Sequence, residues 1–177
     1  MRQERQKKKI LICGDVHAGK STLIRRLIDD MKRPVYGFKT RRMPPDPDGV
    51  SRVYLVPAAE TDFRSGCVII EIDANGRYTG HPELMDSPGA DYLEGIPEGS
   101  LVLLDELGTL ESASPRFKAA VMRILSGRYD VLASVKAQNT DFLREVRRHP
   151  DCELYIITPE NRDALYEQLK REYGIVT

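Results

Sequence analysis

The apolar positions of this 177-residue chain fall into short continuous runs and longer segments with a helical period. The runs at 101–104 and 129–135 show little alternation with polar residues, which is typical of strands buried on both faces. The segments at 116–125 and 140–149 carry apolar residues at helical spacing instead. Strands and helices therefore alternate from residue 101 onward with short connections, which predicts an α/β fold with a mostly parallel, doubly wound sheet.

The two ends of the chain extend this pattern. An apolar run at 10–13 precedes a helical segment that reaches residue 31, and residues 35–40 form the next short strand. A last strand is expected at 154–157, followed by a final helix that starts after Thr158-Pro159-Glu160. Both ends of the chain are thus expected to join one sheet.

The middle of the chain reads differently. Two runs rich in β-branched residues, 52–56 and 67–72, are followed by Asn75-Gly76, a strong hairpin signal. We expect residues 50–80 to form an antiparallel β insertion at the side of the main sheet. Residues 41–49 and 81–100 are rich in proline and glycine and are expected to be loops, the second with one short helix near 90–93.

Composition and charge narrow the class of protein. The length predicts a single domain over residues 1–177, and 27 basic residues balance 27 acidic ones, so nucleic acid is an unlikely partner. Residues 1–8 read as a flexible basic tail without a secretory signal. No run is long enough to cross a membrane, and three widely spaced cysteines indicate reduced core residues. These features predict a cytoplasmic protein, and they neither require nor exclude a protein partner.

The strongest chemical signal is G-x-x-x-x-G-K-S between the first strand and the first helix. In this setting, the pattern is typical of a loop whose backbone N–H groups surround the phosphates of a nucleotide. The helix N-terminus adds its positive dipole end at the same place. The predicted nucleotide-binding residues are Gly14, Asp15, Val16, His17, Ala18, Gly19, Lys20, Ser21 and Thr22.

Two carboxylates follow the buried run at 101–104. If that strand and the first are parallel neighbours, Asp105 and Glu106 lie beside the phosphate loop. We expect Ser21 and Asp105 to hold Mg²⁺, and Glu106 to direct or deprotonate the attacking water. Lys20 is the second predicted catalytic residue, because an amine in this position reaches the β- and γ-phosphates.

Further polar residues are placed near strand ends. Ser134 and Lys136 lie at the carboxyl end of the apolar run at 129–135, where a polar side chain is placed to sense the γ-phosphate. Arg41 and Arg42 come just past the strand at 35–40 and are equally consistent with phosphate contacts and with solvated surface cations. These four residues are candidate γ-phosphate contacts.

Three functions fit a bound triphosphate such as ATP or GTP. Adjacent Asp105 and Glu106 favour hydrolysis, because they supply a metal ligand and a water-directing base together. A small-molecule or nucleotide kinase normally has an arginine-rich lid, and no such segment is evident here. A regulatory GTP- or ATP-binding protein is supported by D-x-x-G at 105–108, but the guanine-reading N-K-x-D motif is missing. Hydrolysis is therefore the leading hypothesis, with the other two as alternatives.

The chain also resembles the small nucleoside-triphosphatase family that includes the cancer-related nucleoside triphosphatase and its prokaryotic relatives. The resemblance covers the first forty residues and the last eighty. It is carried by the segments GDVHAGKST, Gly37-Phe38-x-Thr40, LLDELGTLES up to Glu111, Phe117-Lys118-x-Ala120-Val121, VLASVK and Thr158-Pro159-Glu160-Asn161-Arg162-Asp163.

The resemblance implies slow, Mg²⁺-dependent hydrolysis of ATP, GTP and other triphosphates to the diphosphate and phosphate. It assigns Lys20, Ser21, Asp105 and Glu106 the roles given above. The chain departs from the family where Ser134 and Lys136 replace a usual threonine and histidine. A lysine at this position can stabilise γ-phosphate charge but is a poor proton carrier.

Overall fold

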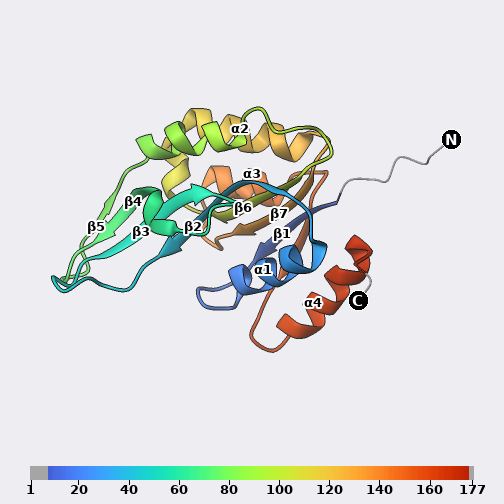
Figure 1. Cartoon of the computed structure of the whole chain (residues 1–177), viewed down its shortest axis with the longest axis horizontal. Helices are drawn as coiled ribbons and strands as arrows, with labels where there is room; N and C mark the ends of the chain where they lie inside the picture. The colour runs from blue at the N-terminus through green and yellow to red at the C-terminus, as the bar shows by residue number, and fades with distance from the viewer. Residues whose placement is uncertain (1–7, 176–177) are drawn as a thin grey trace.

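The computed structural model describes residues 8–175, whose strands form one eight-stranded sheet with helices on both faces (Figure 1). The predicted basic tail lies almost wholly in residues 1–7, outside the described residues. The strands are β1 (Lys9–Cys13), β2 (Val35–Arg42), β3 (Ser51–Pro57), β4 (Cys67–Ile72), β5 (Tyr78–Gly80), β6 (Leu101–Leu107), β7 (Asp130–Val135) and β8 (Glu153–Ile156). The helices are α1 (Lys20–Met31), α2 (Pro115–Ser126), α3 (Asp141–Arg147) and α4 (Arg162–Tyr173), with short turns η1 (Phe63–Ser65), η2 (Met85–Gly89), η3 (Asp91–Leu93) and η4 (Leu110–Ala113).

The strand order is β5-β4-β3-β2-β6-β7-β1-β8. Strands β2, β6, β7, β1 and β8 are parallel, and β3, β4 and β5 continue the sheet in antiparallel fashion. The expected fold class, a parallel doubly wound sheet with an antiparallel insertion, is therefore confirmed. One expectation needs correction: β6 and β1 are not neighbours, because β7 lies between them.

The hairpin that joins β2 to β3 is longer than expected. Arg41 and Arg42 do not follow the strand but belong to it, paired with Tyr54 and Val53 of β3. The antiparallel partner explains the difference, since it satisfies the backbone groups of these two residues and extends β2. At the other end of the insertion, Gly76 has a φ of 79° in the turn between β4 and β5, as the Asn-Gly signal predicts.

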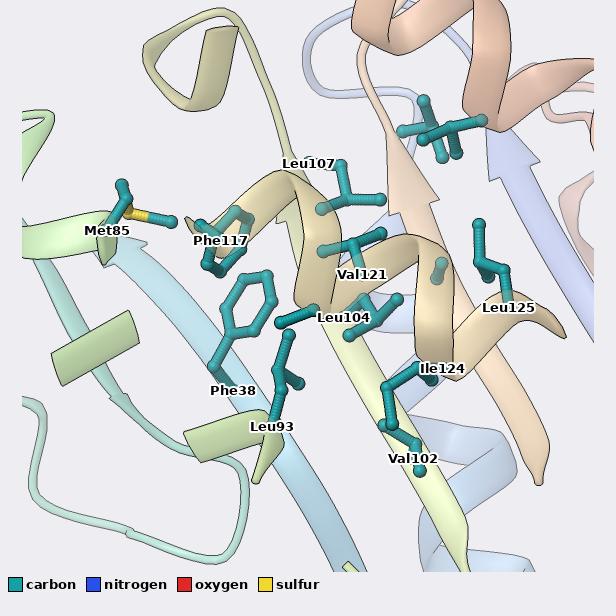
Figure 2. Close-up of a cluster of buried hydrophobic side chains, with 14 of the residues drawn as sticks. Phe38, Met85, Leu93, Val102, Leu104, Leu107, Phe117, Val121, Ile124 and Leu125 are labelled. Carbon is teal, nitrogen blue, oxygen red and sulfur yellow. The ribbon is translucent and has the colours of Figure 1, made fainter. Parts of the chain in front are cut away.

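Helices α2 and α3 cover one face of the sheet, and α1 and α4 cover the other (Figure 1). The predicted inward face of α2 is buried, and Figure 2 shows its side chains against those of β2 and β6. Phe117 meets Phe38 edge to face, with 5.3 Å between the ring centroids. Burial of each such side chain stabilises the fold by about 1.5–3 kcal/mol, so the parallel strands are held firmly between two apolar layers.

The segment between β5 and β6 is more ordered than a loop. It forms η2 and η3, and Met85, Ala90 and Leu93 are buried against α2 and β2. The short helix expected near 90–93 is confirmed as η3, whereas η2 was not expected. Tertiary packing orders η2 although its sequence has little intrinsic propensity for regular structure. Met85, Ala90 and Leu93 therefore belong to the core next to α2 and β2.

Two further expectations concern cysteines and membranes. Cys13 is buried, Cys67 and Cys152 are half-buried, and all three are free thiols. Burial raises the pKa of Cys152 to about 11, which keeps this thiol protonated. Within residues 8–175, no helix has the length and apolar character needed to cross a membrane.

Candidate active site

The predicted phosphate loop connects the carboxyl end of β1 to α1. A side chain at Gly14 would place its Cβ atom 2.5 Å from the carbonyl oxygen of Ile157, so only glycine fits there. Gly19 has a φ of 99° and caps α1, and His17 also lies in the left-handed region. Val16, 70% exposed, stands at the surface of the loop. These conformations curl the backbone from Gly14 to Gly19 into a tight turn that ends at the helix N-terminus.

The side chain of Lys20 is buried, and its ammonium group faces the loop. Its Nζ atom donates hydrogen bonds of 2.9 Å to the carbonyl oxygens of Gly14 and Asp15. The same atom lies 3.3 Å from Oε1 of Glu106. Lys20 and Glu106, the two predicted catalytic residues, are therefore brought together from segments 86 positions apart.

Asp105 receives two hydroxyl groups. Ser21 donates a hydrogen bond of 3.1 Å to its Oδ1 atom, and Ser134 donates a second, very short one. Burial raises the pKa of the Asp105 carboxyl, and both hydroxyl donors act in the opposite direction by stabilising the carboxylate. The predicted metal ligands Ser21 and Asp105 thus lie in direct contact.

Ser134 supplies the second hydroxyl donor to Asp105 from the strand between β6 and β1. Since β7 is the neighbour of β6, the Ser134 side chain reaches Asp105 across the two adjacent strands. It is fully buried and lies on β7 opposite Ile12 of β1. Ser134 is one of the predicted γ-phosphate contacts, and its hydroxyl donates to Asp105 in this structure.

Lys136 lies just beyond the end of β7 and contacts Leu107 and Gly108, whereas Ser134 contacts Asp105. Its backbone N–H donates to the carbonyl oxygen of Leu107, 2.9 Å away. Its aliphatic chain covers Gly108, where a Cβ atom would lie 3.3 Å from Cδ of Lys136. Glu111 accepts the Gly108 N–H at 3.0 Å and is buried. These contacts of Lys136 and Glu111 fix the backbone at Leu107 and Gly108, directly after the Asp105-Glu106 pair.

Glu111 is a strongly perturbed group beside the site. Burial raises its pKa to about 7, although the Gly108 N–H and the nearby Lys136 ammonium favour the carboxylate. The nearby Glu106 carboxylate raises it further. The sequence pattern D-E-x-G-x-x-E drew attention to Glu111, but only the structure shows that its side chain is buried and returns to Gly108.

Arg41 and Arg42 do not act as a pair, because adjacent side chains of a strand point to opposite faces. Arg42 donates to Oγ of Ser51, 2.9 Å away. The guanidinium carbon of Arg41 lies 5.5 Å from the centroid of the Phe63 ring. Within residues 8–175, neither arginine makes a hydrogen bond or ion pair with the loop residues at 14–22.

The structure adds two cations that the sequence analysis passed over. Arg162, the first residue of α4, lies against the phosphate loop, with its Cδ atom 2.8 Å from where a Cβ atom of Gly19 would stand. Lys39 of β2 is paired in register with Asp105. The only sequence signal for Arg162 is its place at the start of a helix, and that for Lys39 is its place near the end of the strand expected at 35–40. Single lysines and arginines are too common at such positions for either signal to identify a site residue.

The side chains near the phosphate loop include possible oxygen ligands for a metal ion. In the part of the chain that the structure describes, no group of three or more His, Cys, Asp or Glu side chains could hold one. Ser21 and Asp105 nevertheless present oxygen atoms, which Mg²⁺ prefers, and nucleotide-bound Mg²⁺ commonly takes one or two protein ligands beside phosphate oxygens. The residues therefore fit a divalent ion that arrives with a triphosphate.

Comparison with known proteins agrees with this geometry. The model of a family described as NTPase matches residues 9–170. The chain belongs to this family. A nucleoside-triphosphatase THEP1 from Thermotoga sp. (strain RQ2) is 25% identical over 162 residues, which cover 91% of this chain and 92% of that protein. Another from Aquifex aeolicus (strain VF5) is 26% identical over 184 residues, covering 91% and 96%.

Two more similarities complete the comparison. A nucleoside-triphosphatase THEP1 from Thermofilum pendens is 35% identical over 100 residues, 55% of each chain. A crystal structure of THEP1 from the hyperthermophile Aquifex aeolicus aligns with a TM-score of 0.73 at 20% identity, covering 91% of this chain and 96% of that one. The family fold therefore extends over nearly the whole described chain.

Proposed function

We propose that this chain hydrolyses nucleoside triphosphates such as ATP and GTP to the diphosphate and phosphate, with Mg²⁺ as cofactor. The observation that carries the proposal is the meeting of both carboxylates with the phosphate loop: Glu106 lies 3.3 Å from Lys20, and Asp105 binds Ser21. The printed name of the THEP1 relatives, nucleoside-triphosphatase, supports the same reaction.

Each residue has one task in this proposal. The backbone N–H groups of the loop at 14–22 and the Lys20 ammonium bind the triphosphate and stabilise the charge that develops on it. Ser21 and Asp105 would hold Mg²⁺, which, when bound, neutralises charge on the β- and γ-phosphate oxygens. Ser134 orients the Asp105 carboxylate.

Glu106 has the remaining task of directing water. Its side chain is only partly buried, 25% exposed, and lies beside the Lys20 ammonium, which in this proposal binds the γ-phosphate. A carboxylate there accepts a proton from a water molecule aligned with the terminal phosphate. The Glu106 backbone N–H donates to Oγ1 of Thr40 at 3.3 Å, which ties this residue to β2.

The test is phosphate release from ATP and from GTP by the wild type, Lys20→Ala and Glu106→Gln. Loss of the water-directing base lowers the rate by about 10²–10⁴-fold, and Lys20→Ala is expected to reduce it at least as much. Arg25→Ala, an exposed cation of α1, and Glu167→Gln, an exposed carboxylate of α4, are the matched controls. A chelator should abolish turnover, and Mg²⁺ should restore it. Undiminished release by Glu106→Gln would show that the water-directing role is wrong.

A further inference from the structure

The proposed hydrolysis leaves a pair of cations on β2 without a task. Lys39 and Arg41 lie two positions apart and therefore point to the same face of the strand. Lys39 is paired in register with Asp105 of β6. The two cations thus lie on the side of the candidate active site that is away from the phosphate loop, next to the segment that carries Glu106.

One aromatic ring restrains both cations. The Lys39 ammonium nitrogen lies 5.3 Å from the centroid of Phe63, and the Arg41 guanidinium carbon lies 5.5 Å from it. Both distances are within the range of favourable cation–π contacts. Phe63 begins η1, and the Asp62 carboxylate caps this turn by accepting the Arg64 N–H at 3.0 Å. Two like charges are therefore held near one another by a turn of the insertion.

Neither cation is neutralised by a close carboxylate. Within residues 8–175, no carboxylate oxygen lies within 4.0 Å of the Lys39 ammonium or the Arg41 guanidinium. Burial lowers the pKa of Lys39, while the more distant Glu60 and Asp105 act in the opposite direction. A partly desolvated ammonium without an ion pair gains more from binding an anion than a fully hydrated one does.

The same face of the hairpin continues into a hollow of about 610 Å³. It begins one step beyond Arg41, since its lining includes Tyr54, the cross-strand partner of Arg41, and Met43, the next residue on that face. Pro44 and Arg64 contribute to the wall. Asp46 and Arg52, which form an ion pair, also line the hollow, and its remaining residues are mostly apolar. The volume is within the range of small-molecule sites, and a mostly apolar lining with a few charged groups suits the organic part of a small ligand.

We propose that Lys39 and Arg41 bind the phosphate group of a second ligand beside the triphosphate, and that the hollow receives the organic part of that ligand. The chemistry recognised is a phosphate dianion, which either a nucleoside monophosphate or orthophosphate released by hydrolysis supplies. The inference rests on the proposed function for the position of the triphosphate. The experiment therefore measures binding rather than hydrolysis.

The first measurement is calorimetric. The protein is saturated with Mg²⁺ and a non-hydrolysable triphosphate analogue, so that the phosphate loop is filled, and is titrated with AMP, with GMP or with orthophosphate. Lys39→Gln and Arg41→Gln are each expected to weaken binding of the second ligand by at least about tenfold, because each removes a charge-assisted contact. Arg77→Gln, an exposed arginine in the turn of the β4–β5 hairpin, should leave the affinity unchanged.

A parallel titration separates this proposal from the proposed function. Lys20→Ala, without the analogue, lacks the lysine of the phosphate loop but keeps Lys39 and Arg41. Binding of the second ligand should persist in this variant, even if hydrolysis is not the reaction of the protein. Loss of all phosphate binding on Lys20→Ala would place every bound phosphate at the loop and would overturn the proposal.

A spectroscopic variant locates the site. The chain contains no tryptophan, so Phe63→Trp introduces a single tryptophan, which can be excited selectively, beside both cations. Its emission should change when the second ligand is added, and in Phe63→Trp combined with Arg41→Gln the same change should need at least about tenfold more ligand. Binding of a monophosphate supports the site with an organic ligand, and binding of orthophosphate alone supports it as a product site. Absence of binding up to about 10 mM, above typical enzyme working concentrations, or binding insensitive to both cations overturns it.

Discussion

The parallel strands and the antiparallel strands β3, β4 and β5 differ in how their polar groups are satisfied. In the parallel half, β1, β6 and β7 are almost wholly buried, and Asp105 at their carboxyl ends receives hydroxyl groups from two other segments. In the antiparallel half, β4 and β5 are only partly buried. Charged side chains there meet at the surface, as Arg52 does with Glu71. The comparison teaches that burial fixes one arrangement of the polar groups at the ends of the parallel strands, whereas charged side chains of the antiparallel half pair at the surface, where solvent competes with them.

The reason lies in the layers that cover each half. The parallel strands lie between α2 and α3 on one face and α1 and α4 on the other (Figure 1). A polar group in that layer must find a partner, because an unsatisfied one costs about 1–3 kcal/mol. The partners of Asp105 are therefore set by packing. Several charged side chains of the β2–β3 hairpin are exposed to solvent, so their positions are less constrained.

The largest expected effect concerns the buried half. Asp105→Asn removes the carboxylate that Ser21 and Ser134 contact, and we expect phosphate release to fall at least about 100-fold. Because burial raises the pKa of Asp105, the neutral amide should be tolerated, and the free energy of unfolding should hold or rise. Rate assays and urea unfolding check both statements. Asp48→Asn, in an exposed loop of the other half, serves as the control, and equal rates for the two variants would contradict the assignment.

A second prediction tests the packing difference. Phe117 is fully buried against Phe38 (Figure 2), and Phe117→Ala should lower the free energy of unfolding by about 3–5 kcal/mol. Tyr78 of β5 is 53% exposed, and Tyr78→Ala should change the free energy of unfolding by no more than about 0.5 kcal/mol. Urea unfolding of both variants supplies the values. Similar losses would mean that the two halves are packed alike.

The smallest expected effect is a pH dependence of the free energy of unfolding that arises from Glu111 in the buried half. Burial raises the pKa of Glu111 to about 7 from 4.5, so the folded chain binds this proton more tightly than the unfolded one. The stability that the protonated group contributes is complete below pH 4.5 and is lost as the pH rises to about 7. Glu111→Gln stays neutral and keeps an oxygen for the Gly108 N–H.

The variant should therefore gain stability relative to the wild type across this interval, by up to roughly 3 kcal/mol. Urea unfolding at several pH values measures the difference, with Glu167→Gln as an exposed control. A difference between Glu111→Gln and the wild type that does not vary with pH would show that burial does not perturb Glu111.

The sequence was sufficient for features that depend on neighbouring residues. The glycines at 14 and 19, the strand before them and the helix after them predicted the loop, because its conformation depends on local backbone freedom. The Asn-Gly turn and the apolar face of α2 were predicted for the same reason. In segment 81–100 the short helix near 90–93 was predicted but η2 was not, since the order of η2 comes from contacts with α2 that no local pattern encodes.

What the sequence determined by itself is therefore the phosphate loop, the alternation of strands and helices, and the two carboxylates after a buried strand. Only the tertiary structure decided that β7 stands between β6 and β1, that Ser134 as well as Ser21 donates to Asp105, and that Lys39 and Arg41 both lie near the ring of Phe63. Strand order and cross-strand contacts join residues far apart in the chain. They follow from how whole layers bury their apolar faces together, and no short pattern of residues carries that information.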